Sequence, residues 1–255
     1  MKKYSVLTFL MNDYDIVREP LEISEECEYV LVTDNKTLKS DTWTIKYIPD
    51  ELMTKDGFTK SFYVRYHPFE FVTTDICIVL DASIRINKSL DKLVDDFLTS
   101  QKDICLSVHW NMINAWPEYV YWVNYRNYSR AQAERGMSFM RAIGYTPEYK
   151  GCFEATFKIQ KNNAINNEIN DCVWRALMML GNNKYADRVD QSILSAIMNT
   201  LYEDTAVFPI TRTLYQSTYM TCFEHHSTTP LTVNILKKDY FLFNKKCELY
   251  EIHDN

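Results

Sequence analysis

Short apolar runs that end in polar residues recur along the first half of the chain. The first, Tyr4–Leu10, is followed by the polar turn Asn12–Asp15. Runs of this length, closed by Asp, Asn or Pro, are typical of buried strands. The same pattern predicts strands at Tyr29–Thr33, Trp43–Ile48, Ile76–Leu80 and Ile104–Val108. We therefore expect an open sheet that presents ligand groups at the strand ends.

Helical spacing appears between these runs and dominates the second half. Thr59–Phe71 is compatible with a helix that Pro68 limits or bends. No element is assigned to Asn111–Tyr128, which is rich in Trp, Tyr and Asn. Further helices are predicted at Leu90–Thr99, capped by Asn87 or Ser89, at Ser129–Ile143, at Asn166–Leu180, and at Asp190–Leu201, capped by Asp187 or Asp190. Further strands are predicted at Glu154–Ile159, Thr218–Phe223 and Tyr240–Phe243. The fold class is α/β, with a mainly parallel sheet flanked by helices.

Composition supports one globular domain. The chain has 255 residues, 46% hydrophobic and 24% charged, without a repeat or linker. Its net charge of -6 argues against nucleic acid as a partner, so an anionic ligand needs a local basic pocket. The 14% of aromatic residues suits stacking on bases and sugars, although core packing explains most such rings. Neither glycine-rich phosphate loop, G-x-G-x-x-G or G-x-x-x-x-G-K-[ST], occurs.

The cysteines and the N-terminus give information on the cellular location of the protein. Seven scattered cysteines, never closer than twenty residues, argue against a disulfide framework and a cysteine zinc site. No stretch approaches the roughly 20 apolar residues that span a bilayer, and the first apolar run lacks a cleavage site. We expect a cytoplasmic protein without a transmembrane segment, with peripheral membrane contact left open.

The strongest local signal is the apolar run Ile76–Leu80, which delivers Asp81 at its carboxyl end. A lone Asp in this place is often a turn former or a helix cap. Whether Asp81 has a functional role is therefore judged from the motifs in the rest of the chain. Lys60 and Arg65 are the basic residues that can approach an anion beside this strand, although both also suit a solvated helix face.

That wider pattern resembles a glycosyltransferase-like family known from plant pectin- and mucilage-related proteins and from bacterial polysaccharide gene clusters. The motifs that carry this resemblance occur along the chain in the family's order. They are Asn12–Pro20 with its "YD" turn, Tyr29–Asp34 ending in "TD", Trp43, Lys60–Pro68 (KSFYVRYHP), Asp81-Ala82-Ser83, and Arg188-Val189-Asp190-Gln191. Each motif is weak alone, and their common order over roughly 190 residues makes the resemblance moderately specific.

The resemblance implies a GT-A type fold, with a nucleotide-binding half (1–110) and an acceptor-binding half (111–255). It implies a transferase that moves a sugar from a nucleotide-sugar donor, UDP-linked, to a glycan acceptor in polysaccharide biosynthesis. Asp13, Tyr14 and Asp34 would border the base and ribose. Asp81 and Ser83 would occupy the acidic metal motif, and His225 or His226 could add a ligand for Mn²⁺ or Mg²⁺, with a surface or hydrogen-bonded structural pair as the alternative for these histidines. Ser83 replaces a second carboxylate, which puts metal dependence in doubt.

Candidates for the reaction and the acceptor follow. Asp190 is the candidate catalytic carboxylate, with Gln191 as a sugar partner; a simple helix cap is the alternative for Asp190. Glu154 is the competing catalytic candidate. Trp110 and Trp116 are candidates for an acceptor wall, with a buried aromatic cluster as the alternative. Two other functions stay open: a non-catalytic sugar- or nucleotide-binding module, and a hydrolase that uses Asp81 and Asp190 as paired carboxylates.

Overall fold

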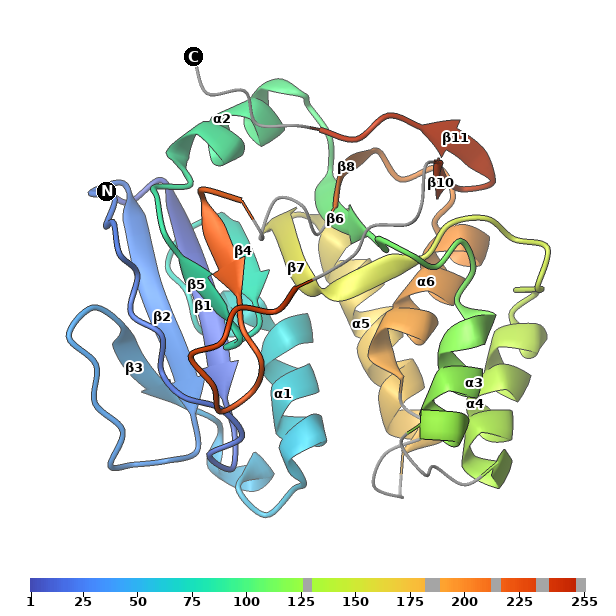
Figure 1. The fold of residues 1–255 in the computed structure, drawn as a ribbon, viewed down its shortest axis with the longest axis horizontal. Helices are drawn as coiled ribbons and strands as arrows, with labels where there is room; N and C mark the ends of the chain where they lie inside the picture. Colours follow the sequence, from blue (N-terminus) through green and yellow to red (C-terminus); the bar gives the residue numbers. More distant parts are fainter. Residues whose placement is uncertain (126–129, 182–188, 212–216, 233–238, 251–255) are drawn as a thin grey trace.

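The fold is a single α/β domain built on one mostly parallel sheet of seven strands (Figure 1). A computed structural model describes residues 1–125, 130–181, 189–211, 217–232 and 239–250. The sheet order is β3-β2-β1-β4-β7-β6-β8, and β7 is antiparallel to both of its neighbours. The strands are β1 Tyr4–Leu10, β2 Cys27–Thr33, β3 Thr44–Tyr47, β4 Ile76–Leu80, β6 Ile104–Val108, β7 Phe153–Lys161 and β8 Val207–Thr211.

The central strands are continuous apolar runs because helices cover both faces of the sheet. On one face, Val6 and Ile78 belong to a core that also contains Phe97 of α2 (Asp91–Thr99). On the other face, Leu7 and Val79 pack with Val64 of α1 (Gly57–Tyr66). The helices that form the second core with β6 and β7 are α3 (Trp116–Tyr125), α4 (Arg130–Ala142), α5 (Ala164–Leu180) and α6 (Asp190–Leu201).

Small elements complete the chain. Two 3-10 turns, η1 (Asp50–Leu52) and η2 (Pro68–Glu70), flank α1. The strand pairs β5 (Ile84–Ile86) with β9 (Met220–Cys222), and β10 (Tyr240–Leu242) with β11 (Lys245–Cys247), are antiparallel. The β5–β9 pair brings the tail back to the residues that follow β4. All seven cysteines are free thiols.

The sequence predicted this architecture and missed some details. The predicted mainly parallel sheet with flanking helices is confirmed, while the GT-A identity stays a prediction. The predicted helix at Thr59–Phe71 ends at Tyr66, because Pro68 starts a separate 3-10 turn. The unassigned segment contains α3. The two proposed halves share the sheet, since β7 inserts between β4 and β6.

Candidate functional site

The carboxyl ends of β1, β2 and β4 lie at one edge of the sheet, because these strands are parallel neighbours. Asp13 and Tyr14 follow β1, Asp34 follows β2, and Asp81 follows β4. Residues that the sequence separates by about seventy positions are thus gathered at one place. This edge is where ligands bind in open α/β sheets.

Arg65 joins two of the predicted carboxylates in one ion-pair cluster. Its guanidinium donates to Asp81 through one terminal nitrogen and to Asp190 through the other. The side chains of Arg65, Asp81 and Asp190 are 9%, 28% and 18% exposed, so the guanidinium is buried while both carboxylates keep contact with solvent. Helix α1, the end of β4 and the start of α6 therefore meet at Arg65.

Both carboxylates of this cluster point to Arg65. The cap position of α6 is occupied by Val189, so Asp190 is the first helical residue and not the predicted cap. The backbone carbonyl of Asp81 accepts from the Ile84 amide at 3.0 Å, while its carboxylate turns to Arg65. A simple cap or turn does not explain either side chain.

The Arg65 cluster contains one positive charge and two negative charges. Burial raises the pKa of Asp81, Arg65 opposes that shift, and the negative charge of Asp190 adds to it. Arg65 loses hydration on burial, yet the two carboxylates raise its pKa above the usual value. Its Nε is buried without a hydrogen-bond partner among the described residues. One fixed cation faces two carboxylates at a partly open edge.

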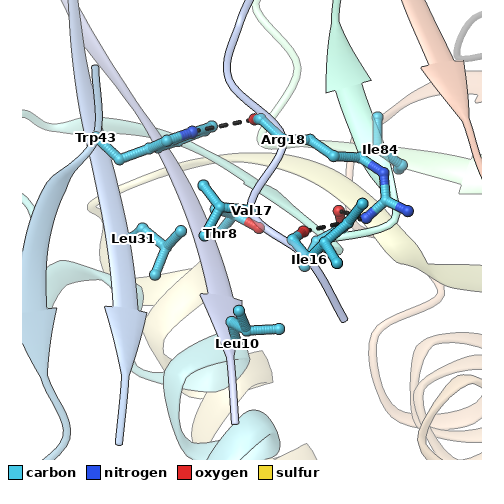
Figure 2. Close-up of a pocket in the computed structure, with 9 residues that line it drawn as sticks. Thr8, Leu10, Ile16, Val17, Arg18, Leu31, Trp43 and Ile84 are labelled. Carbon is cyan, nitrogen blue, oxygen red and sulfur yellow. Dashed lines mark hydrogen bonds between the residues drawn. The ribbon is translucent and has the colours of Figure 1, made fainter. Parts of the chain in front are cut away.

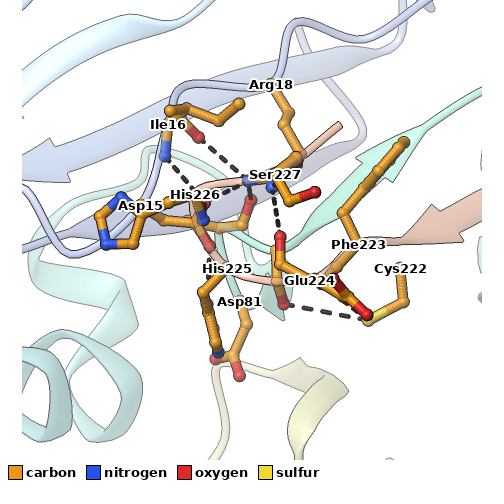
Figure 3. Close-up of polar contacts among 12 residues, drawn as sticks. Asp15, Ile16, Arg18, Asp81, Cys222, Phe223, Glu224, His225, His226 and Ser227 are labelled. Carbon is orange, nitrogen blue, oxygen red and sulfur yellow. Dashed lines mark hydrogen bonds and ion pairs between the residues drawn. The ribbon is translucent and has the colours of Figure 1, made fainter. Parts of the chain in front are cut away.

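A second charged cluster, Asp15 with Arg18, lies beside the first and holds the tail in place (Figure 3). Arg18 donates to Asp15 at 2.7 Å and to the Ala82 carbonyl at 2.9 Å. Its other terminal nitrogen donates to the carbonyls of Glu224, at 3.2 Å, and Ser227, at 3.0 Å. Arg18 lies within the Asn12–Pro20 motif, and the sequence alone predicted no role for it.

His225 sits between the two clusters. Its Nδ1 is 2.7 Å from Asp15 Oδ2, and Figure 3 shows its ring beside the carboxyl group of Asp81. The Tyr14 ring lies 4.7 Å from the His225 ring, centroid to centroid. Both side chains are about half exposed, at 57% for Tyr14 and 50% for His225. They form an open aromatic surface next to Asp81.

The predicted metal ligands are only partly brought together. Ser83 is buried with its hydroxyl 4.0 Å from the Cys222 sulfur, because its carbonyl pairs with Phe223 beside the β5–β9 ladder. Asp81 and His225 lie together, but Asp81 already pairs with Arg65. Over the described ranges, no group of three or more His, Cys, Asp and Glu side chains could hold a metal ion. These residues alone do not fit a divalent cation, and no chemical step is assigned to one.

The predicted base and ribose contacts form a paired network. Lys60 donates to Asp34 at 2.7 Å and to the Asn12 side chain at 3.1 Å. Asp34 also accepts from the Asn12 amide, at 2.9 Å, and Asp13 accepts from Asn35 at 2.9 Å. Lys60 and Asp34 are thus mutually neutralised. Asp34 anchors the turn after β1, where Asn12 and Asp13 have positive φ angles of 54° and 52°.

Glu154 is far more enclosed than Asp190. It lies in β7, where the predicted strand begins one residue late, and is 2% exposed. Ser107 donates to its carboxylate at 3.1 Å, and His109 Nε2 lies 4.0 Å from the other oxygen. His109 Nδ1 accepts two backbone N–H groups, from Asn111 and Met112, so its neutral form carries the proton on Nε2, facing Glu154.

The predicted acceptor residues fall in two places. Gln191 follows Asp190 in α6 and is partly exposed. Trp110 stacks on His109, with ring centroids 5.8 Å apart. Trp116 packs against the second core, stacked on Tyr145. Arg188 lies outside the described residues. Gln191 is therefore the predicted acceptor residue that adjoins the Arg65 cluster.

A small cavity adjoins the site and is lined in part by Thr8, Arg18, Trp43 and Ala82 (Figure 2). It measures about 10 Å³, room for one water molecule. The Thr8 hydroxyl is buried with no partner in the part of the chain that the structure describes. The cavity is therefore too small for any ligand much larger than a water molecule.

Comparison with known proteins gives no family assignment. No protein-family model matches the sequence, and no curated protein matches it as a significant relative. In the described ranges, every helix is too short or too polar to cross a membrane. The site is therefore interpreted from its own geometry.

Proposed function

We propose that this protein is a glycosyltransferase that moves a sugar from a nucleotide-sugar donor, UDP-linked, to a hydroxyl of a glycan acceptor. The observation that carries the proposal is the cluster in which Arg65 links Asp81 and Asp190 at the carboxyl edge of the sheet. The ordered motifs that resemble a glycosyltransferase-like family support the donor class. The assignment of this α/β fold to the GT-A type is part of the same proposal.

The chemistry requires a cation and a base. The acceptor oxygen forms a bond to the anomeric carbon as the bond to the diphosphate breaks, and the electron pair leaves with the phosphate. Arg65 is placed to stabilise the charge that develops on the leaving group. Asp190 is the base that accepts the acceptor proton, because it is more exposed than Glu154 and next to Gln191. Tyr14 and His225 offer an exposed surface for the base or sugar.

A non-catalytic sugar- or nucleotide-binding module is the second candidate. Its specific support is that Arg65 already pairs with both carboxylates, so neither is a free base. Ser83, turned toward Cys222, also leaves the acidic motif with one carboxylate. The two functions differ in donor hydrolysis, which a transferase performs slowly and a binding module does not.

Calorimetry with UDP, ADP, GDP and CDP, with and without Mn²⁺, tests the proposal. We expect UDP to bind best, and Asp81→Ala to abolish transfer without unfolding the chain, because Asp81 orients the Arg65 guanidinium. Asp171→Asn is a matched control, since Asp171 pairs with Arg175 on the exposed side of α5. If none of the nucleotides binds with or without the metal, the transferase proposal is wrong. Binding without donor hydrolysis favours the module.

A further inference from the structure

His225 follows β9 in a turn and is oriented by a buried carboxylate. Its Nδ1 lies 2.7 Å from Asp15 Oδ2, and the His225 side chain is 50% exposed while that of Asp15 is 1% exposed. Burial by itself would raise the pKa of Asp15, but hydrogen bonds from Arg18, His225 and two backbone amides outweigh burial and lower that pKa. Asp15 is therefore ionised near neutral pH and can only accept, so Nδ1 of His225 is the donor.

The backbone around His225 is fixed by the same two residues that fix its ring. Arg18 donates to two carbonyls of this turn, at 3.2 Å and 3.0 Å, and the His226 amide donates to Asp15 Oδ1 at 3.1 Å. The positive φ of His226, 56°, reverses the chain at this point. Arg18 and Asp15 thus determine where the His225 ring lies and how it is turned.

The other ring nitrogen of His225, Nε2, makes no hydrogen bond to the described residues. Figure 3 shows the ring beside the carboxyl group of Asp81, which accepts from Arg65. The Tyr14 ring lies against the His225 ring, with centroids 4.7 Å apart. His225 therefore places one unused polar nitrogen at the edge of the sheet where Arg65 meets Asp81.

An anionic ligand at this edge needs more positive charge than Arg65 supplies. Arg65 faces two carboxylates, Lys60 pairs with Asp34, and Arg18 pairs with Asp15. The charge of each of these three cations is already balanced or outweighed by carboxylates. A ligand that brings further negative charge is therefore bound more tightly if another cationic donor faces it.

We propose that His225 is a ligand-binding residue of the site, which as an imidazolium donates from Nδ1 to Asp15 and from Nε2 to a phosphate oxygen of the ligand. The proposal rests on the proposed function for the identity of that ligand, the diphosphate of a nucleotide sugar. Both ring nitrogens of histidine are donors only in the charged form, and Asp15 supplies the acceptor that this form requires. Asp15 and Arg18 touch no ligand and act as positioning residues of His225.

The first test needs no ligand. Long-range ¹H–¹⁵N NMR of the histidine rings, recorded in alkaline buffer where imidazole is neutral, shows which ring nitrogen carries the proton. His225 is assigned as the signal lost in His225→Asn and kept in His226→Asn, a control in which Asn tolerates the positive φ. We expect the proton of His225 on Nδ1. A proton on Nε2 overturns the proposal, because Nδ1 would then not donate to Asp15.

The second test uses UDP as the probe, by calorimetry in mildly acidic buffer that contains either EDTA or Mn²⁺. His225→Asn keeps a short amide that can donate to Asp15 and removes Nε2. We expect UDP to bind this variant about 10- to 100-fold more weakly than the wild type in both buffers, because one charged hydrogen bond is lost. His226→Asn is the matched control, since the exposed His226 contacts Asp15 through its backbone amide, and should bind UDP like the wild type.

Uridine, which lacks the phosphates, separates a phosphate contact from a structural role. Its affinity should be the same for His225→Asn and the wild type, and an equal loss for uridine and UDP overturns the proposal. A UDP loss seen only with Mn²⁺ overturns it too, because Nε2 would then bind the metal ion. Unchanged UDP binding by His225→Asn overturns the role of His225 and leaves the transferase proposal standing. If the wild type binds no UDP in either buffer, the proposed function fails and the phosphate contact fails with it.

Discussion

Two arginines, Arg18 and Arg65, are almost equally buried, at 8% and 7% exposed, and yet their surroundings differ. Arg18 uses its terminal nitrogens on Asp15 and four backbone carbonyls. Arg65 pairs with two carboxylates, and its Nε has no partner among the described residues. The first cluster has the satisfied contacts of a structural clamp, while the second keeps a buried Nε without a partner in the described residues, as is expected of the proposed site.

The carboxylates differ in the same way. Asp15 is 1% exposed, and burial alone would raise its pKa. Hydrogen bonds from Arg18, His225 and the Ile16 and His226 amides outweigh burial and lower its pKa. Asp81 is 28% exposed, and burial raises its pKa. The two carboxylates therefore differ in the direction of their pKa shift, downward for Asp15 and upward for Asp81.

The largest expected effect is on activity. Asp190→Asn should lower the release of UDP from a UDP-sugar donor by about 10²- to 10⁴-fold, because it removes the proposed base. UDP affinity should change little, since Arg65 keeps Asp81. The measurement is steady-state transfer and UDP calorimetry on the same sample. A variant that retains more than about a tenth of the wild-type rate would rule out Asp190 as the base.

The next effect is on stability. Arg18→Met should reduce the free energy of unfolding by about 3–5 kcal/mol, because Asp15 is left charged and buried and the tail carbonyls lose their donor. Urea denaturation followed by tryptophan fluorescence measures this. Arg175→Met, which removes an exposed pair with Asp171, is the control and should change stability by less than about 1 kcal/mol. Equal losses in both variants would contradict the clamp.

Asp81→Asn should separate function from stability. Burial disfavours the charged form of Asp81 in the folded state, so a neutral Asn at this position avoids that cost. We therefore expect the variant to unfold at the same urea concentration as the wild type or at a higher one. Nucleotide-dependent activity should be lost in the same protein. A clear fall in the urea midpoint would show that Asp81 is a structural residue.

A smaller effect is expected in acid. The lowered pKa of Asp15 contributes stability above its unfolded value, which is lost as pH falls through the folded value. The raised pKa of Asp81 works oppositely, because the folded state then binds the proton more tightly and gains stability as pH falls. Relative to the wild type, Asp15→Asn should therefore become less destabilising as pH falls below about 4. Asp81→Asn should lose any advantage on acidification. The measurement is the urea midpoint of each variant and of the wild type between pH 3 and pH 7. If the stability differences of both variants changed in the same direction with pH, Asp15 and Asp81 would not differ as described.

Much of the fold could be predicted because burial leaves a direct pattern. Tyr4–Leu10 and Ile76–Leu80 are continuous apolar runs in the sequence and central strands in the structure. β8 was missed because Pro209 argues against a strand, and its place at the sheet edge explains why proline is tolerated. β5 and β9 are three residues each, and their pairing joins parts of the chain that no local pattern connects.

The candidate site was predictable only residue by residue. Asp81 and Asp190 stood out at element ends, but Arg65 reaches Asp190 across 125 residues of sequence, a contact that only the folded chain makes. Arg18 donates to carbonyls more than 200 residues away in the sequence. No local residue pattern predicts contacts over such a separation.

The most direct test of the central claim is a crystal structure of the protein soaked with UDP. We expect diphosphate density against the Arg65 guanidinium, beside Asp81 and His225, with the base near Tyr14. Density at another surface, or none at a UDP concentration that saturates binding in solution, would contradict it.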